Sequence, residues 1–147
     1  MRIVLLDAGP LGLAVHPRPV AGFRDWLVSL GAAGTPIVVP EIAHYELRRE
    51  LLRMDLRGSV ARLDRLIAAC MYAPITTPVV LRAAQLWADA RRQGRPTADD
   101  KALDGDVILA ATALELIDRG DDAIIATTNV SHLGRFVAAA KWEEIRP

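Results

Sequence analysis

Short apolar runs alternate along the chain with longer stretches in which hydrophobic residues recur at helical spacing. The runs lack the polar alternation of a half-exposed sheet face, which is typical of strands buried on both faces. The first run ends at a charged residue, and a turn is expected after it at Asp7–Pro10. Strands are therefore predicted over Ile3–Leu6, Ile37–Val39 and Ala123–Ala126, with a last strand over Lys141–Ile145.

Helices are predicted where apolar positions recur every three or four residues and where glycine, proline or a capping residue marks an end. The polar segment Gly94–Lys101 is expected to be a loop. Strands that alternate with helices indicate an α/β fold with a mainly parallel sheet, whose ligand sites lie beyond the carboxyl ends of its strands. The predicted helices are Gly22–Leu30 closed by Gly31, Glu41–Arg53, Ser59–Cys70 capped by Ser59, Val79–Arg92, Asp104–Arg119 ended by Gly120, and a short helix over Ser131–Val137.

The length of 147 residues and the 52% hydrophobic content are those of one compact domain covering residues 1–147. No apolar run is long enough to cross a membrane, so no membrane association is expected. The single cysteine, Cys70, cannot form an internal disulfide, and a reducing cytoplasm is the expected compartment. The net charge of zero neither requires nor excludes a nucleic-acid partner.

The sequence lacks the short motifs of several common enzyme classes. It contains no GxSxG nucleophile elbow, no GxxxxGK[ST] phosphate loop, no GxGxxG and no HExxH. His16, His44 and His132 are too scattered to form a metal set and are interpreted as surface or packing residues. The candidate chemistry therefore rests on acidic residues near the ends of the predicted strands.

Asp106 lies on the apolar stripe of its predicted helix, together with Ala110 and Ala113. A carboxylate that faces the interior needs a partner, and a cation is the simplest one. Asp104 falls about 160° away around the helix, on the solvent side, where its ordinary role is the N-cap. Asp7 follows the first strand, where ligands bind in such sheets, although a cap for the next turn or helix explains it equally well.

Glu46 lies one turn after Ile42 on the helix that follows the second strand, so its backbone is near the sheet. Taken alone, it is better explained as a surface residue paired with Arg49. Together with Asp7 and Asp106 it would form an oxygen-only site, which suits Mg²⁺ or Mn²⁺ and not zinc. Such a site suits phosphoryl chemistry, because the ion generates hydroxide near neutral pH and neutralises phosphate charge.

Four segments of the sequence resemble, in order and spacing, the signature segments of PIN-domain proteins, and most closely those of VapC-type toxins. The resemblance spans Ile3 to about Phe136, and the pattern D-x-x-[IL]-A-A that begins at Asp106 is its most specific part. It implies a three-layer α/β/α domain with a central, mainly parallel sheet, and an endoribonuclease that depends on a metal. The four segments are IVLLDAGPLG, PEIAHYELRRE, LDGDVILAATAL and IIATTNVSHL.

The resemblance also implies site residues and a cofactor. Asp7, Glu46 and Asp106 match the three family acids that bind Mg²⁺ or Mn²⁺. Asn129 stands where a fourth acid is common, which puts a full second metal site in doubt. Asp104 is a candidate to compensate by reaching a second ion through water.

Thr127 and Thr128 follow the third strand and are candidates to orient Asp7 or the substrate through their hydroxyls. The partners that the resemblance implies are an RNA substrate and a small antitoxin. An amphipathic antitoxin segment is expected to lie in an apolar groove near Phe23–Leu30 and Glu41–Cys70. A homodimer is also expected, because exposed apolar patches seldom stay uncovered.

Other interpretations stay open at this point. A catalytically weak or inactive PIN-like module that binds RNA or protein is favoured by the missing fourth acid. A small-molecule α/β enzyme or binding module without metal would leave the acids as caps and surface charges. Within the nuclease class, an adjacent antitoxin gene would favour a toxin over an RNA-processing or DNA-repair enzyme.

Overall fold

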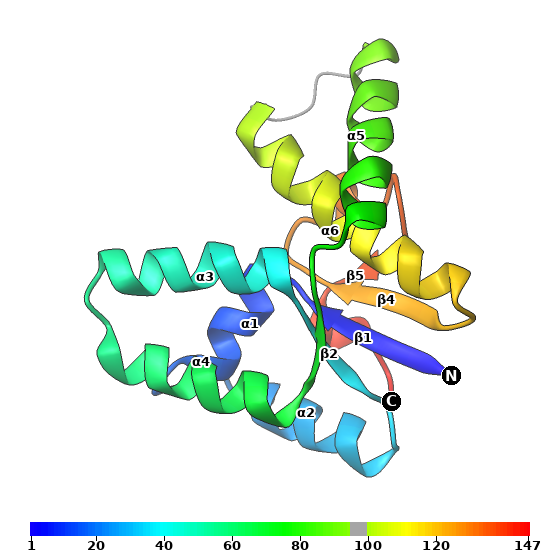
Figure 1. The fold of residues 1–147 in the computed structure, drawn as a ribbon. Coiled ribbons are helices and arrows are strands. Elements are labelled where there is room, and N and C mark those ends of the chain that lie inside the picture. Colours follow the sequence, from blue (N-terminus) through cyan, green and yellow to red (C-terminus); the bar gives the residue numbers. More distant parts are fainter. Residues whose placement is uncertain (95–99) are drawn as a thin grey trace.

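A five-stranded parallel sheet forms the centre of the protein (Figure 1), in a computed structural model that describes residues 1–94 and 100–147. The strand order is β3-β2-β1-β4-β5, so the N-terminal strand β1 lies in the middle of the sheet. Each pairing is parallel, which confirms the α/β fold expected from the sequence. The strands are β1 Arg2–Leu6, β2 Ile37–Pro40, β3 Met71–Ala73, β4 Asp122–Ala126 and β5 Ala139–Ala140.

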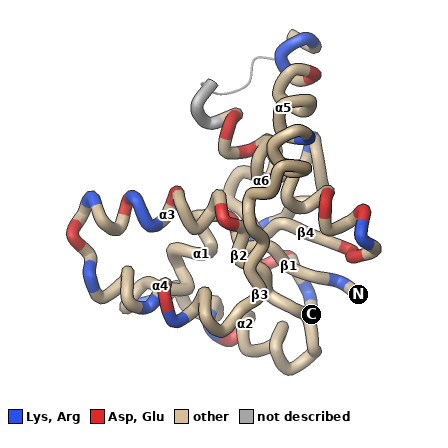
Figure 2. The backbone as a smooth tube through the Cα atoms, viewed as in Figure 1, with Lys and Arg blue, Asp and Glu red and all other residues tan. Residues whose placement is uncertain are grey.

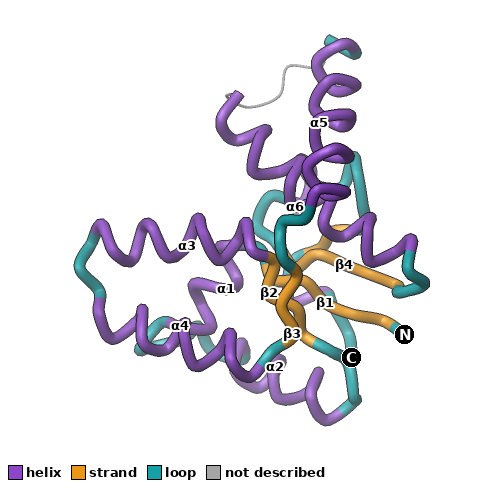
Figure 3. The backbone as a smooth tube through the Cα atoms, viewed as in Figure 1, coloured by secondary structure: helices purple, strands orange, loops and turns teal. Residues whose placement is uncertain are grey.

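Helices connect the strands and cover both faces of the sheet, so the expected three-layer α/β/α architecture is confirmed (Figure 3). One prediction matches the observed bounds in full, the helix over Glu41–Arg53. The helices are α1 Ala8–Val15, α2 Phe23–Ala32, α3 Glu41–Arg53, α4 Arg57–Ala69, α5 Thr77–Arg92, α6 Asp100–Asp118 and α7 Val130–Leu133, followed by a 3₁₀ helix, η1, at Trp142–Glu144.

The central strand β1 supplies side chains to two separate cores because successive residues point to opposite faces of the sheet. Val4 and Leu6 pack in a core shared with α1, α2, α3 and α4. Ile3 and Leu5 pack on the other face in a core shared with α6 and α7. Helix α5 packs mainly on α6, through a smaller cluster that includes Val79, and projects beyond the sheet (Figure 1).

The turn predicted at Asp7–Pro10 is wrong, because α1 begins directly after β1 at Ala8. Asp7 is the N-cap residue, and its Oδ1 accepts a hydrogen bond from the Ala8 amide at 2.7 Å. Pro10 is tolerated in the first turn because the amide that proline lacks has no partner within the helix at this position. The short α1 therefore starts at the carboxyl edge of the sheet.

Three predicted helix ends are also corrected. Helix α2 runs through Gly31 to Ala32, and Gly34 adopts the left-handed conformation with φ of +73° instead. Ser59 is not a cap, since α4 already begins at Arg57 and Ser59 is buried within its first turn. Asp104 is not an N-cap either, because α6 begins one turn earlier, at Asp100.

The strand predicted over Lys141–Ile145 is wrong, and β5 occupies only the two residues before it. The chain then turns into η1, which places the Trp142 ring 5.3 Å from that of Phe23 and 5.7 Å from that of Trp26, between centroids. This aromatic packing favours a compact turn over continued pairing with β4. The edge strand β3 was not predicted, because three residues are too few for a periodicity signal.

The predicted loop at Gly94–Lys101 falls mostly on residues 95–99, which lie outside the described residues, and α6 already includes Lys101. Among the helices that the structure describes, none is both long and apolar enough to cross a membrane.

Candidate active site

Asp7 sits where the central strand β1 ends, and its carboxylate is held from two sides. Oδ1 caps α1, and Oδ2 accepts a hydrogen bond from the hydroxyl of Thr127 at 2.7 Å. Thr127 follows β4, which pairs with β1 in the register Leu6 to Ala126, so adjacent parallel strand ends bring the two side chains together. Thr127 is 1% exposed, and its Oγ1 also accepts from the Asn129 amide at 2.9 Å. Asp7 is thus both a cap and a member of the site, which resolves the ambiguity left by the sequence.

A cavity of about 300 Å³ lies at this edge of the sheet and brings the three expected acids together. We call it the acidic cavity. Asp7 reaches it from the end of β1, Glu46 from α3 and Asp106 from α6. Its lining is Asp7, Ala8, Gly9, Glu46, Arg49, Asp106, Thr128 and Asn129.

Glu46 can take this position because α6 has a glycine, Gly105, beside its carboxylate. A Cβ atom built on Gly105 would lie closer than 3.0 Å to Oε1 of Glu46, a separation that real Cβ atoms essentially never show. Gly105 directly precedes Asp106, so one glycine allows both carboxylates to enter the same cavity. Sequence reasoning missed Gly105. The clue in the sequence was a glycine inside a strongly helical segment, where glycine lowers helix stability by about 1 kcal/mol relative to alanine.

Asp106 points into the protein, as its helical stripe predicted. Its side chain is 15% exposed, and Ala110 and Ala113 on the same stripe are fully buried. Nδ1 of His132 lies 3.8 Å from its Oδ2, so protonation of this imidazole would form an ion pair. His132 had been interpreted as a surface or packing residue. Its position three residues after Asn129 was the only sequence clue that it lies near the site.

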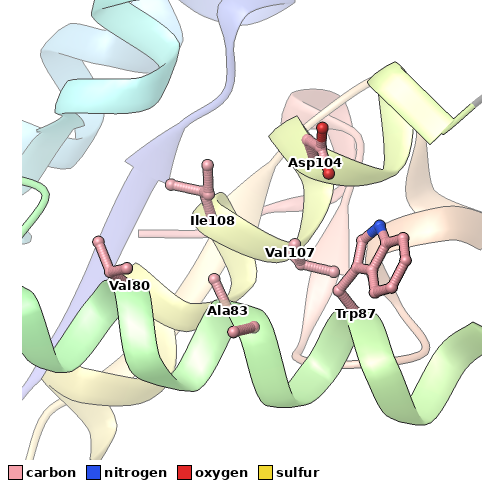
Figure 4. Close-up of a pocket in the computed structure, with 7 residues that line it drawn as sticks. Val80, Ala83, Trp87, Asp104, Val107 and Ile108 are labelled. Atoms are coloured by element: carbon pink, nitrogen blue, oxygen red, sulfur yellow. The ribbon is translucent and has the colours of Figure 1, made fainter.

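The structure does not bring Asp104 to the acidic cavity. Asp104 is exposed and lines a different, largely apolar cavity of about 380 Å³ between α5 and α6. Figure 4 shows it on α6 above Val107, with Trp87 of α5 nearby. The predicted contrast between an inward Asp106 and an outward Asp104 is therefore confirmed.

Burial and like charge work against ionisation of two of the three acids. Burial raises the pKa of Glu46, and the negative charges of Asp7 and Asp106 raise it further, while Arg49 opposes the shift. Burial likewise raises the pKa of Asp106, with Asp7 adding to the effect and His132 and Arg135 opposing it. Such a group of carboxylates gains from a neutralising cation.

The donor chemistry of the acidic cavity fits a hard divalent cation, because the candidate ligands are carboxylate oxygens supplemented by hydroxyl and amide oxygens. The carboxylates are not drawn into a preformed cluster: within the described ranges, no three Asp, Glu, His or Cys side chains lie close enough to hold a metal ion. The fit therefore rests on donor type, shared burial and mutual repulsion.

The two other accessory candidates have different surroundings. Thr128 is exposed and lines the cavity, with its methyl group 3.5 Å from where a Cβ on Gly9 would lie. It makes no side-chain hydrogen bond to any described residue, so only Thr127 orients Asp7. Asn129 is also exposed and lines the cavity at the start of α7. No acid stands in its place, which agrees with a site built on three acids.

No protein-family model matches the chain, and the comparison with curated proteins gives no significant match. Solved structures do match over nearly the whole length. A structure of VapBC2 from Rickettsia felis bound to a DNA fragment from their promoter has a chain that matches with a TM-score of 0.74 at 16% identity, covering 95% of this chain and 98% of that chain. A structure of VapBC-1 from nontypeable Haemophilus influenzae matches with a TM-score of 0.70 at 18% identity, covering 97% of this chain and 99% of that chain.

A third match is FitAcB from Neisseria gonorrhoeae, with a TM-score of 0.65 at 23% identity, covering 97% of this chain and 99% of that chain. At these identities the likeness concerns the fold, and it extends over nearly the whole chain. The comparisons thus show that this chain has the PIN-like fold found in VapBC and FitAB structures.

Proposed function

We propose that the protein is a metal-dependent endoribonuclease that hydrolyses RNA phosphodiester bonds, and that it acts as the toxin of a type II toxin–antitoxin pair. The acidic cavity carries this proposal, because carboxylates from three separate elements share one hollow at the ligand-binding edge of a parallel sheet. The fold likeness to VapBC and FitAB structures supports the toxin assignment.

Asp7, Glu46 and Asp106 would hold Mg²⁺ or Mn²⁺ in this site. The bound cation supplies an acidified water and neutralises charge on the phosphate. Thr127 keeps the carboxylate of Asp7 in one orientation through its hydrogen bond to Oδ2. Arg49 adds a positive charge at the cavity wall, which favours phosphate entry beside three acids that would otherwise repel it.

The test is cleavage of total RNA by the purified chain with Mn²⁺ or Mg²⁺, with and without a chelator. We expect cleavage that the chelator abolishes. Asp106→Asn should remove activity at unchanged circular dichroism, whereas Asp104→Asn, two residues away on the opposite face of α6, should retain most of it. Equal loss in both variants would contradict the role given to the acidic cavity. Persistent absence of cleavage together with RNA binding would favour an inactive PIN-like binding module.

The antitoxin is proposed to bind a groove between α1, α3 and α4, which has a volume of about 580 Å³. Leu47 and Leu51 of α3 form one wall, and Met54 and Leu56, both substantially exposed, extend the apolar surface. An amphipathic segment that folds on binding suits such a groove. Three apolar residues of α2, Phe23, Trp26 and Leu30, are buried in the core, so they do not contribute to the expected apolar groove.

Hydrogen exchange of the chain co-expressed with its operon neighbour tests this placement. Protection should appear along the facing sides of α1, α3 and α4. Protection confined to α5 and α6 would contradict it.

Helix α5 supports the proposed homodimer, because Val80 and Leu81 are 52% and 67% exposed near the apolar cavity that Asp104 also lines. Light scattering on the free protein would measure its molar mass and thus show whether it is a dimer.

A further inference from the structure

Arg49 is the arginine of α3 that forms no hydrogen bond or ion pair with another described residue, although its charge lowers the pKa of the nearby Glu46. Arg48 forms an ion pair with Asp64 and donates to Nε2 of His44. Arg53 forms an ion pair with Glu50 at 2.8 Å. By contrast, Arg49 has no hydrogen bond or ion pair with any residue in the described ranges, and its contact is with a ring. Its guanidinium is therefore available to an external anion.

The ring beneath Arg49 is that of Tyr45, one helical turn earlier, with the guanidinium carbon 5.1 Å from the ring centroid. Tyr45 is 57% exposed, so its ring is accessible to a ligand. The ring is not a conventional hydrogen-bond acceptor, so the N–H groups of the guanidinium remain available to donate to an anion. The pair therefore offers an aromatic surface and a set of anion-binding donors at one place.

Arg49 also stands between two hollows. On one side it lines the acidic cavity with Asp7, Glu46 and Asp106. On the other side it lines a hollow of about 320 Å³ on the outer side of α3, whose remaining lining is Glu41, His44, Tyr45, Arg48 and Leu52. A ligand with a phosphate in the first hollow can place a neighbouring planar group in the second.

The second hollow is distinct from the groove proposed for the antitoxin. Tyr45 and Arg49 lie about 160° around α3 from Leu47 and Leu51, which line that groove, so the two surfaces are on opposite faces of the helix. Figure 2 shows basic and acidic positions mixed along α3 and α4, so the subsite depends on Arg49 itself and not on a broad basic surface. One helix thus presents its two faces to two different partners.

From these observations we infer that Tyr45 and Arg49 form a nucleotide subsite for single-stranded RNA. The base next to the scissile phosphate stacks on Tyr45, and Arg49 binds the phosphate that enters the acidic cavity. Unpaired bases are commonly held on aromatic rings and guanidinium planes, whereas a duplex hides its base faces. The inference rests on the proposed function, because that function places RNA in the acidic cavity.

The experiment is fluorescence anisotropy of a short labelled single-stranded RNA of one defined, unstructured sequence, titrated with the full chain in EDTA so that metal-dependent cleavage cannot occur. Tyr45→Ala should weaken binding about fivefold or more, the effect of losing one stacked base. Tyr45→Phe, which keeps the ring, should bind like the wild type. Arg49→Gln should weaken binding and reduce the slope of log affinity against log salt by about 0.7, the value for one phosphate contact on a single strand.

Arg53→Gln is the matched control, because it removes the same charge from an exposed site one turn further along α3. It should leave the affinity for RNA almost unchanged, and a duplex of the same sequence should bind more weakly to the wild type. Equal affinities of wild type, Tyr45→Ala and Arg49→Gln would overturn the subsite.

Addition of Mn²⁺ in a second step separates this result from the proposed function. Cleavage by the wild type with no effect of either substitution on RNA binding or cleavage would overturn the subsite and leave the ribonuclease standing. Weakened binding in both variants without cleavage by any protein would support the subsite and overturn the ribonuclease. Failure of the wild type to bind RNA would overturn the subsite whatever the cleavage result.

Discussion

A methyl group added at Gly105 tests whether the carboxylate of Glu46 must stay where the structure places it. The new Cβ of Gly105→Ala would lie closer than 3.0 Å to Oε1 of Glu46, while ordinary contact begins at 3.4 Å, so the carboxylate must retreat by at least 0.4 Å. The three acids must draw closer together to hold a cation, and metal–ligand distances then vary by only about 0.2 Å, so a displaced Glu46 carboxylate is a poorer ligand. The substitution should therefore weaken Mn²⁺ binding and lower RNA cleavage by about tenfold or more, because small misplacements of reacting groups cost large factors in rate.

Stability should change in the opposite direction. Alanine is favoured over glycine inside a helix by about 1 kcal/mol, and the Glu46 carboxylate is the mobile end of a flexible side chain that can move aside at little cost. The melting temperature should thus rise by about 2–4 °C or stay unchanged. Thermal melts by circular dichroism and cleavage of RNA under single-turnover conditions give the two readings.

Gly31→Ala in α2 is the matched control, since a Cβ at Gly31 meets nothing within 4 Å. It should gain similar helix stability and retain full activity. If Gly105→Ala kept wild-type cleavage and Mn²⁺ affinity, the close approach of Gly105 to Glu46 would have no functional meaning. A large drop in its melting temperature would show instead that the carboxylate cannot move aside.

Two further predictions concern the charges and hydrogen bonds of the site. The pKa values of Glu46 and Asp106 are raised on folding. The folded state therefore binds more protons than the unfolded state above about pH 4. The free energy of unfolding consequently decreases as the pH rises and these two carboxyl groups must ionise in the folded protein. The melting temperature of metal-free Glu46→Gln relative to the wild type should therefore increase between roughly pH 4 and pH 7; a constant difference would refute the electrostatic argument. Thr127→Val should lower stability by about 1–3 kcal/mol, because the Asp7 carboxylate and the backbone amide of Asn129 each lose a hydrogen-bond partner. Thr128→Val, at an exposed site without such bonds, should have little effect, and equal losses in the two variants would count against the role of Thr127.

Much of the fold could be predicted because its strongest elements are also its most regular. The strands predicted from apolar runs agree with the observed bounds of β1, β2 and β4 to within one residue at each end. The helix over Glu41–Arg53 was predicted in full because it contains no glycine or proline. The mistakes fall where tertiary contacts decide the conformation. Pairing of β3 and β5 at the edges of the sheet and aromatic packing around Trp142 leave no periodic signal in the sequence.

The acids of the site could be named from sequence for a related physical reason. Asp7 follows a buried strand, and Asp106 faces an apolar stripe, so each occupies a position where a carboxylate is costly without a partner. The neighbours of the acids were harder to find. Gly105 acts across a helix–helix contact, Arg49 had been interpreted as a surface partner of Glu46, and His132 approaches Asp106 through the short α7.

The most direct test of the central claim, that Asp7, Glu46 and Asp106 act together as one cation site, is calorimetric titration of Mn²⁺ into the metal-free protein. We expect saturable binding by the wild type and by Asp104→Asn, and loss of that binding in Asp7→Asn, Glu46→Gln and Asp106→Asn alike, because each removes one carboxylate from the acidic cavity. Binding of Mn²⁺ that survives Asp106→Asn but disappears in Asp104→Asn would contradict the account.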